Sequence, residues 1–168
     1  AIGVVIGHEM THGFDDQGRN FNADGNMADW WTKDDSERFN AAAQKLADQF
    51  DQITVVGDLK ANGQLTLGEN IADQGGLRVA FDAFKGTQQF QKGEEMDGFT
   101  PAQRFYLSYG RIWAEHQTEE NMYQQTKSDP HSLGRYRVNA TLRNIDDFYQ
   151  AFGVKEGDKM WLAPEERT

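Results

Sequence analysis

The residues His8-Glu9-Met10-Thr11-His12 form an H-E-x-x-H pattern near the start of the chain. On a helix, positions four apart lie on one face, so the imidazoles of His8 and His12 can bind one zinc ion. Glu9 then lies beside the metal, where a base for a water molecule is needed. The alternatives are a chance match or two structural histidines. The apolar flanks favour the zinc site, because imidazoles inside an apolar helix need partners.

A second acidic pair, Glu69 and Asp73, lies four positions apart in the segment LGENIAD. A catalytic zinc takes three protein ligands and keeps one position open. The chain has no cysteine, which excludes disulfides and thiolate ligands and makes a carboxylate the natural third ligand. We expect Glu69 to reach the metal and Asp73 to accept the remaining N–H of a ligating histidine. A solvated acidic helix face explains this spacing equally well.

His131 and Arg137 lie in a third polar cluster, DPHSLGRYR. Hydrolysis of a peptide bond at zinc develops negative charge on an oxygen and requires donors directed at it. The two side chains can provide such donors. By spacing alone, a surface loop with ordinary charges is the simpler interpretation.

The elements that must position these residues are mostly helical, with little room for sheet. Apolar spacing predicts helices over residues 1–13, 33–50, 67–85 and 146–152, and another that starts at Thr100-Pro101 and carries Phe105, Tyr109, Ile112, Trp113 and His116 on one face. Thr32 or Asp34 is the expected cap of the second helix. Thr66 and Glu69 fit a capping box for the third, and Gly153 fits a C-terminal cap for the last. Residues 13–31 and 128–139 are expected to be loops.

Length and charge limit the classes of function. The 168 residues suit one domain, residues 1–168. Acidic residues outnumber basic ones by 27 to 17, which gives a net charge of −10. Such a charge repels phosphate backbones and anionic lipid heads, so we expect no nucleic-acid partner and no membrane contact from this segment.

The clusters together resemble the C-terminal catalytic part of the neprilysin-type zinc metallopeptidases, the M13 family. The resemblance covers nearly the whole chain. It rests on IGHEMTHGFDDQGRNF, the DWW at 29–31, NGQLTLGENIADQGGL, and DPHSLGRYRVNATLRN followed by AFGVKEGDKM. The joint occurrence of these segments in family order is far more specific than H-E-x-x-H alone.

The resemblance implies a mainly α, gluzincin-type catalytic helical domain that binds one Zn2+ per chain and hydrolyses small peptides. It implies His8, His12 and Glu69 as zinc ligands and Glu9 as general base. Asp73 would orient the first histidine, and His131 and Arg137 would stabilise the tetrahedral intermediate and hold the substrate carbonyl. The pocket for a hydrophobic residue after the scissile bond would include Val5 and Trp113, with Val4 nearby; plain core packing is the alternative for these three.

The departures from the family pattern are informative. The chain starts inside an expected core helix, and the N-terminal strands and capping domain of the family are absent, so we interpret it as a fragment whose partner is the missing N-terminal part. Animal members carry disulfides, so a chain without cysteine favours a bacterial, oligoendopeptidase-like protein. The resemblance to the family, and not the lack of cysteine, favours an extracytoplasmic location. The competing hypothesis is an isolated, non-catalytic zinc-binding helical fragment.

Overall fold

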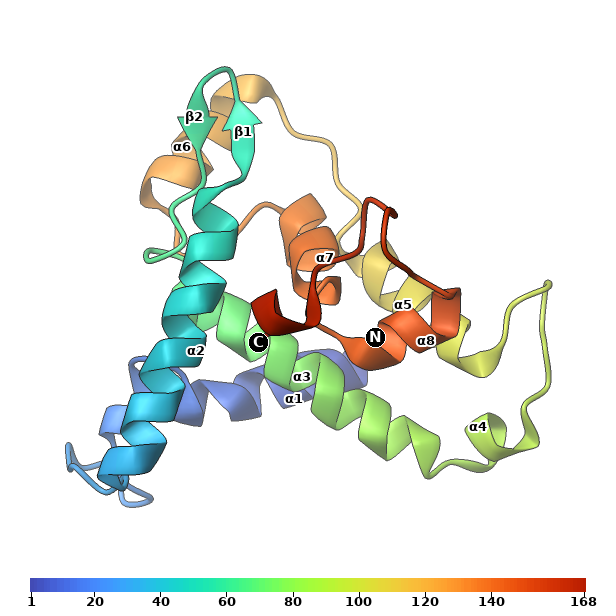
Figure 1. Ribbon diagram of the computed structural model, residues 1–168, viewed down its shortest axis with the longest axis horizontal. Coiled ribbons are helices and arrows are strands. Elements are labelled where there is room, and N and C mark those ends of the chain that lie inside the picture. The colour runs from blue at the N-terminus through green and yellow to red at the C-terminus, as the bar shows by residue number, and fades with distance from the viewer.

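The computed structural model describes all residues from 1 to 168 and is built almost entirely from helices (Figure 1). The α-helices are α1 (Ile2–Thr11), α2 (Lys33–Asp51), α3 (Leu67–Lys85), α4 (Gln88–Lys92), α5 (Pro101–Ile112), α6 (Glu119–Ser128), α7 (Gly134–Leu142) and α8 (Asp146–Phe152). Short 3-10 helices are η1 (His12–Phe14), η2 (Gly18–Asn20) and η3 (Pro164–Glu166). Strands β1 (Thr54–Val56) and β2 (Leu59–Lys60) form one antiparallel hairpin, with Thr54 opposite Lys60. The expected mainly α class is confirmed.

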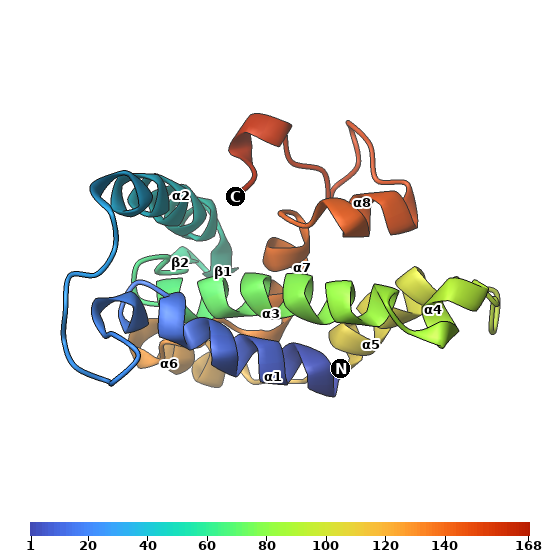
Figure 2. The ribbon, with the colours of Figure 1, turned by 90° about the horizontal axis from the view of Figure 1, so that it is seen from below.

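Helices α1 and α3 run side by side in opposite directions through the middle of the molecule (Figures 1 and 2). Glycines allow this close approach. A Cβ atom placed on Gly76 would lie only 2.6 Å from the carbonyl oxygen of Val4 and from the amide nitrogen of His8. A Cβ atom on Gly7 would lie 3.0 Å from the Cα atom of Gly76. The helix with the H-E-x-x-H pattern is therefore packed almost backbone to backbone against the helix with Glu69.

Helix α3 contributes to both hydrophobic cores, which makes it the central element of the fold (Figure 2). One core joins α3 to α1, α5, α7 and α8 through Val4, Leu77, Ala80, Phe81, Tyr106, Tyr109, Leu142, Ile145, Phe148 and Tyr149. The other lies between α2 and α3 and contains Ala43, Leu46, Ala47, Phe50 and Leu67. Because α3 is fixed from two sides, its acidic side chains occupy defined positions.

No helix in this structure has both the length and the apolar character needed to cross a bilayer.

Several helix ends agree with the sequence, and one predicted cap is wrong. The third helix runs from Leu67 to Lys85 as expected, and Thr32 caps α2 by accepting a hydrogen bond from the amide of Asp35. Gly153 ends α8 with a positive φ of 64°. Thr66, however, makes no side-chain cap. Its hydroxyl donates to the carbonyl of Asn62 at 3.0 Å, and the Glu69 carboxylate is directed to the histidines instead of to the helix end.

Two further expectations are corrected. Helix α5 ends at Ile112, so His116 does not continue its face. The expected loop 128–139 is interrupted by α7, which begins at Gly134 and places Arg137 on a helix. The short α4, the β1–β2 hairpin and α6 were not anticipated.

Candidate metal centre

Helices α1 and α3, with the first residue of η1, bring His8, His12 and Glu69 to one point. One potential ligand atom from each residue lies within 4.8 Å of the other two. The Nε2 atoms of His8 and His12 are 3.1 Å apart. The Glu69 carboxylate lies 3.2 Å from Nε2 of His8 through Oε2, and 3.5 Å from Nε2 of His12 through Oε1. The structure thus brings together all three residues that the sequence predicts as ligands.

The spacing of these atoms fits a tetrahedral zinc ion. Zinc–nitrogen bonds of about 2.0–2.1 Å place two tetrahedral ligand atoms about 3.3 Å apart. The two Nε2 atoms, 3.1 Å apart, are close to this value, and each lies within 3.5 Å of a different oxygen of the Glu69 carboxylate. Two imidazoles and one carboxylate are also a common donor set for catalytic zinc.

Each of the two histidines is held by a carboxylate on its other ring nitrogen. Nδ1 of His8 lies 2.9 Å from Oδ1 of Asp73, and Nδ1 of His12 lies 2.7 Å from Oδ2 of Asp15. A proton on each Nδ1 satisfies these bonds and leaves both Nε2 atoms as acceptors. Two facing lone pairs at 3.1 Å repel each other unless a proton or a metal ion lies between them. The tautomers set by the carboxylates therefore favour a metal.

The role of Asp15 was missed in the sequence, where residues 13–31 were expected only to form a loop. Asp15 is 5% exposed, and its Oδ1 accepts hydrogen bonds from the amides of Gln17 and Gly18 at 2.9 and 2.7 Å. Gly18 has no room for a side chain, because a Cβ atom would collide with the carbonyl of His12. The available signal was an aspartate one turn after the second histidine, followed by a glycine three residues later.

Oppositely charged side chains stabilise one another in this site. Burial opposes protonation of His8, but hydrogen bonds to Asp73 and Glu69 outweigh it and raise the pKa of the imidazole to about 9. Burial also opposes ionisation of Glu69, yet the hydrogen bond from His8 and the charge of His131 lower the pKa of its carboxyl. Surroundings that stabilise the charged imidazole and the carboxylate together also favour a bound cation.

His131 and Arg137 reach the same site from the segment that contains α7. Nε2 of His131 lies 3.3 Å from Oε1 of Glu69, and Nδ1 of His131 lies 2.7 Å from Oδ1 of Asp129. Arg137 donates to Asp73 twice, from Nε and Nη2, at 2.8 Å each. Asp129 is a further contact that the sequence did not reveal, although it lies only two residues before His131.

Contacts with α3 and α5 fix this segment. The Ser132 hydroxyl donates to the side-chain oxygen of Asn70 at 3.0 Å, and Asn70 is fully buried. The Tyr109 hydroxyl donates to the backbone carbonyl of Arg137 at 3.0 Å. The donors on His131 and Arg137 are therefore attached to the same helix that carries Glu69 and Asp73.

A small cleft of about 130 Å³ opens beside the three candidate ligands. Its lining comprises Val4, Val5, His8, Glu9, Glu69, Asp73, Tyr109, Ile112, Trp113, His131 and Arg137. Glu9 is exposed, whereas Val4 is only 2% exposed and also belongs to the core, as its alternative interpretation proposed. Ile112 and Tyr109 were not predicted as lining residues of this cleft.

Comparison with known protein families shows to which family this chain belongs. The sequence model for peptidase family M13 matches residues 1–168. The chain belongs to peptidase family M13. The M13 chain is 41% identical to neprilysin-1 of Caenorhabditis elegans over 165 residues, which cover 95% of this chain and 22% of that protein.

Solved structures of M13 proteins share this fold. The M13 chain superimposes with a TM-score of 0.92 on the Mycobacterium tuberculosis zinc metalloprotease Zmp1 in complex with an inhibitor, at 39% identity, covering 99% of this chain and 26% of that one. The TM-score with PepO from Lactobacillus rhamnosis is 0.85 at 36% identity, covering 98% of this chain and 25% of that one. The chain thus spans about a fifth of neprilysin-1 and about a quarter of these structures.

Proposed function

We propose that this chain is the C-terminal catalytic part of a zinc-dependent endopeptidase that cleaves small peptides before a hydrophobic residue. One observation carries the proposal: the Nε2 atoms of His8 and His12 converge with Glu69 at tetrahedral spacing, while a carboxylate holds each Nδ1. The share of the M13 relatives that the chain covers supports its assignment as one part of a longer peptidase.

In this proposal, His8, His12 and Glu69 hold one Zn2+ per chain. When bound, the ion supplies Lewis-acid chemistry, because it lowers the pKa of water at the site and polarises the scissile carbonyl. Asp73 and Asp15 keep the two imidazoles in the ligating tautomer.

The remaining steps belong to side chains of this protein. Glu9 lines the cleft without a hydrogen-bonded partner, so its carboxylate is free to accept a proton from the attacking water. The water oxygen bonds to the carbonyl carbon, and donors on His131 and Arg137 stabilise the oxyanion that develops. Glu9 then delivers the proton to the leaving amine as the C–N bond breaks.

Val5 and Trp113 contact the substrate side chain after the scissile bond (P1′) in this proposal. Both line the cleft, as does Ile112, and Val4 packs behind them. Apolar walls beside a charged metal site favour a hydrophobic side chain, because burying it there contributes roughly 25 cal/mol per Å².

By family analogy, we propose an extracytoplasmic bacterial compartment for the protein.

One observation favours the second candidate, a non-catalytic zinc-binding fragment. Ile2, Ile6 and Met10 lie along the outer face of α1 and are 73%, 56% and 65% exposed. Such an apolar stripe suits a covering segment. We expect the missing N-terminal part of the protein to supply that cover and to complete the substrate cleft, so the chain alone would be weakly active or inactive.

Two measurements test the proposal: zinc stoichiometry tests the metal site that both candidates share, and peptide cleavage separates the candidates. Elemental analysis of the dialysed chain gives the zinc stoichiometry, for which we expect one ion per chain. A folded chain without zinc would mean that the site forms only in the longer protein.

Cleavage of a peptide with leucine at P1′ is then compared between the chain and the full-length protein. We expect turnover in the full-length protein and its loss in Glu9→Gln, with zinc still bound. Retained turnover in Glu9→Gln would overturn the role of Glu9 as base. A chain that binds zinc but cleaves no peptide, beside an active full-length protein, would favour the non-catalytic candidate for the chain itself, and a full-length protein that binds zinc but cleaves no peptide would overturn the proposed function.

A further inference from the structure

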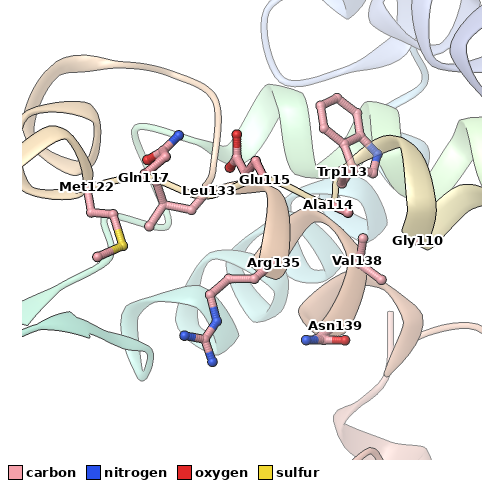
Figure 3. Close-up of a pocket in the computed structure, with 10 residues that line it drawn as sticks. All are labelled: Gly110, Trp113, Ala114, Glu115, Gln117, Met122, Leu133, Arg135, Val138 and Asn139. Atoms are coloured by element: carbon pink, nitrogen blue, oxygen red, sulfur yellow. The ribbon is translucent and has the colours of Figure 1, made fainter. Parts of the chain in front are cut away.

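Trp113 and Arg137 line the same cleft and contact each other. Its ring centroid is 4.0 Å from the Cζ atom of Arg137, so the guanidinium stacks on the indole face. The cleft that Trp113 lines also contains two of the candidate ligands, His8 and Glu69. On another side it borders a second cavity of about 290 Å³, where Figure 3 shows it among residues of α5 and α7. One indole ring therefore touches the P1′ side of the cleft and the proposed oxyanion donor.

Arg137 connects this ring to the metal ligands. Its Nε and Nη2 atoms bind the two oxygens of Asp73, and Oδ1 of Asp73 lies 2.9 Å from Nδ1 of His8. These three side chains are 7%, 2% and 9% exposed. Nη1 of Arg137 makes no hydrogen bond within the protein, so it remains as the donor for a substrate oxygen. The direction of that donor depends on the plane of the guanidinium, which the stacked indole helps to fix.

The backbone after α5 couples the ring to α7. The carboxylate of Glu115 accepts a hydrogen bond from the amide of Gly134 at 2.9 Å, at the first residue of α7. A Cβ atom on Gly134 would lie 2.6 Å from the carbonyl oxygen of Trp113. The segment that carries the indole is thus in contact with the start of the helix that carries Arg137, and neither can shift independently.

We propose that Trp113 is a positioning residue that acts through Arg137, so that the P1′ side chain of the substrate affects the rate of the chemical step as well as binding. This inference rests on the proposed function. A large apolar P1′ side chain packs against the indole and holds it on the guanidinium, which aligns Nη1 with the developing oxyanion. A small P1′ side chain leaves the indole less restrained and the donor less well aligned.

The first test is spectroscopic and does not require turnover. In the zinc-loaded full-length protein with 15N-labelled arginine, the Nε–H resonance of Arg137 should be shifted by the ring current of the stacked indole. Loss of the signal in Arg137→Lys assigns it. We expect Trp113→Leu to abolish the shift and Trp113→Phe to retain part of it, whereas Trp161→Leu, which removes a tryptophan packed against the core, should leave it unchanged.

The second test is kinetic and uses two peptides that differ only in leucine or alanine at P1′. In the wild type, leucine should raise kcat and lower KM. In Trp113→Leu, kcat with the leucine peptide should fall about 2- to 30-fold, the range expected for loss of one cation–π contact, and the dependence of kcat on P1′ should disappear. Trp113→Phe should restore part of both. Val5→Ala, which alters a lining residue that makes no contact with Arg137, should raise KM alone.

The outcomes distinguish this inference from the proposed function. An unchanged Arg137 resonance in both Trp113 variants, or a full P1′ dependence of kcat in Trp113→Leu, overturns the inference. If Trp113→Leu does not fold, Trp113→Met replaces it in both tests. A wild type that cleaves neither peptide overturns the proposed function and the kinetic part of the inference, while the resonance still decides whether Trp113 positions Arg137.

Discussion

Arg137 and Asp73 are joined by two hydrogen bonds of 2.8 Å, from Nε to Oδ2 and from Nη2 to Oδ1. The same Oδ1 lies 2.9 Å from the imidazole of His8. One carboxylate on α3 therefore holds a candidate zinc ligand on α1 and a candidate oxyanion donor on α7. Changes at Asp73 should disturb metal binding and transition-state stabilisation together.

Asp73→Asn should weaken zinc binding about 10- to 100-fold, because the amide is a poorer acceptor for the His8 N–H and does not support the ligating tautomer. Competition with a chelator of known affinity measures this loss. Asp82→Asn is the matched control, since Asp82 lies on the exposed side of the same helix and pairs with Lys85. Equal zinc affinity in the two variants would contradict the orienting role of Asp73.

Asp15→Asn should weaken zinc binding by a similar factor, about 10- to 100-fold, through His12. Unlike Asp73, Asp15 does not contact Arg137, so kcat at saturating zinc should change less than in Asp73→Asn. Asp16→Asn provides the neighbouring control, because Asp16 binds no histidine. A larger loss of affinity in Asp16→Asn than in Asp15→Asn would rule out this role.

Gly76→Ala should force α1 away from α3, because its methyl group would meet backbone atoms of Val4 and His8 at 2.6 Å. We expect a loss of roughly 1–3 kcal/mol in the free energy of unfolding together with weaker zinc binding. Gly110→Ala is the control in the interior of α5, where the new methyl group meets only Val138 at 3.8 Å. That variant should be neutral or more stable in urea unfolding.

Asp129→Asn should lower kcat about 10-fold and leave zinc affinity unchanged. Loss of a complete oxyanion donor costs about 100- to 1,000-fold, and the neutral amide would still orient the His131 ring in part. The double variant Asp129→Asn/His131→Ala tests whether Asp129 affects kcat through His131. If Asp129→Asn lowers kcat equally in that background, Asp129 does not act through His131.

The sequence predicts the two helices that carry the candidate ligands well, because the pattern that indicates each helix lies within its own segment. Spacing of four in His8/His12 and in Glu69/Asp73 places each pair on one helix face, and α1 and α3 lie where periodicity predicted them. The structure brings both pairs together, yet no local pattern indicated that the two helices would pack through Gly7 and Gly76.

The capping box predicted at Thr66 does not form, because the Glu69 carboxylate makes stronger contacts elsewhere. Near His8 and Arg137 its carboxylate gains contacts with cationic partners, at 3.2 and 3.3 Å. At the helix end it would gain only one backbone amide. Local sequence rules do not include such distant partners.

Helix α7 was missed for a related reason. Its first residue, Gly134, is preceded by Leu133, which has no capping side chain. The acceptor for the first amide comes from Glu115, which is 19 residues earlier in the chain. When a residue far away in the sequence accepts the hydrogen bond from the first amide of a helix, the sequence of the helix itself contains no capping residue that would indicate its start.

The contact of α1 with α3 through Gly7 and Gly76 also has a consequence for ion selectivity. Backbone atoms in direct contact cannot be pushed closer, and separating them sacrifices the packing of the core around Val4 and Leu77. The distance between the candidate histidine and glutamate ligands is therefore limited by the interhelical spacing, which suits metal–ligand bonds of about 2.0–2.1 Å. Calcium requires bonds of about 2.3–2.6 Å and six to eight oxygen ligands, whereas this site offers two imidazoles and one carboxylate at a fixed interhelical spacing, so we expect it to prefer zinc over calcium.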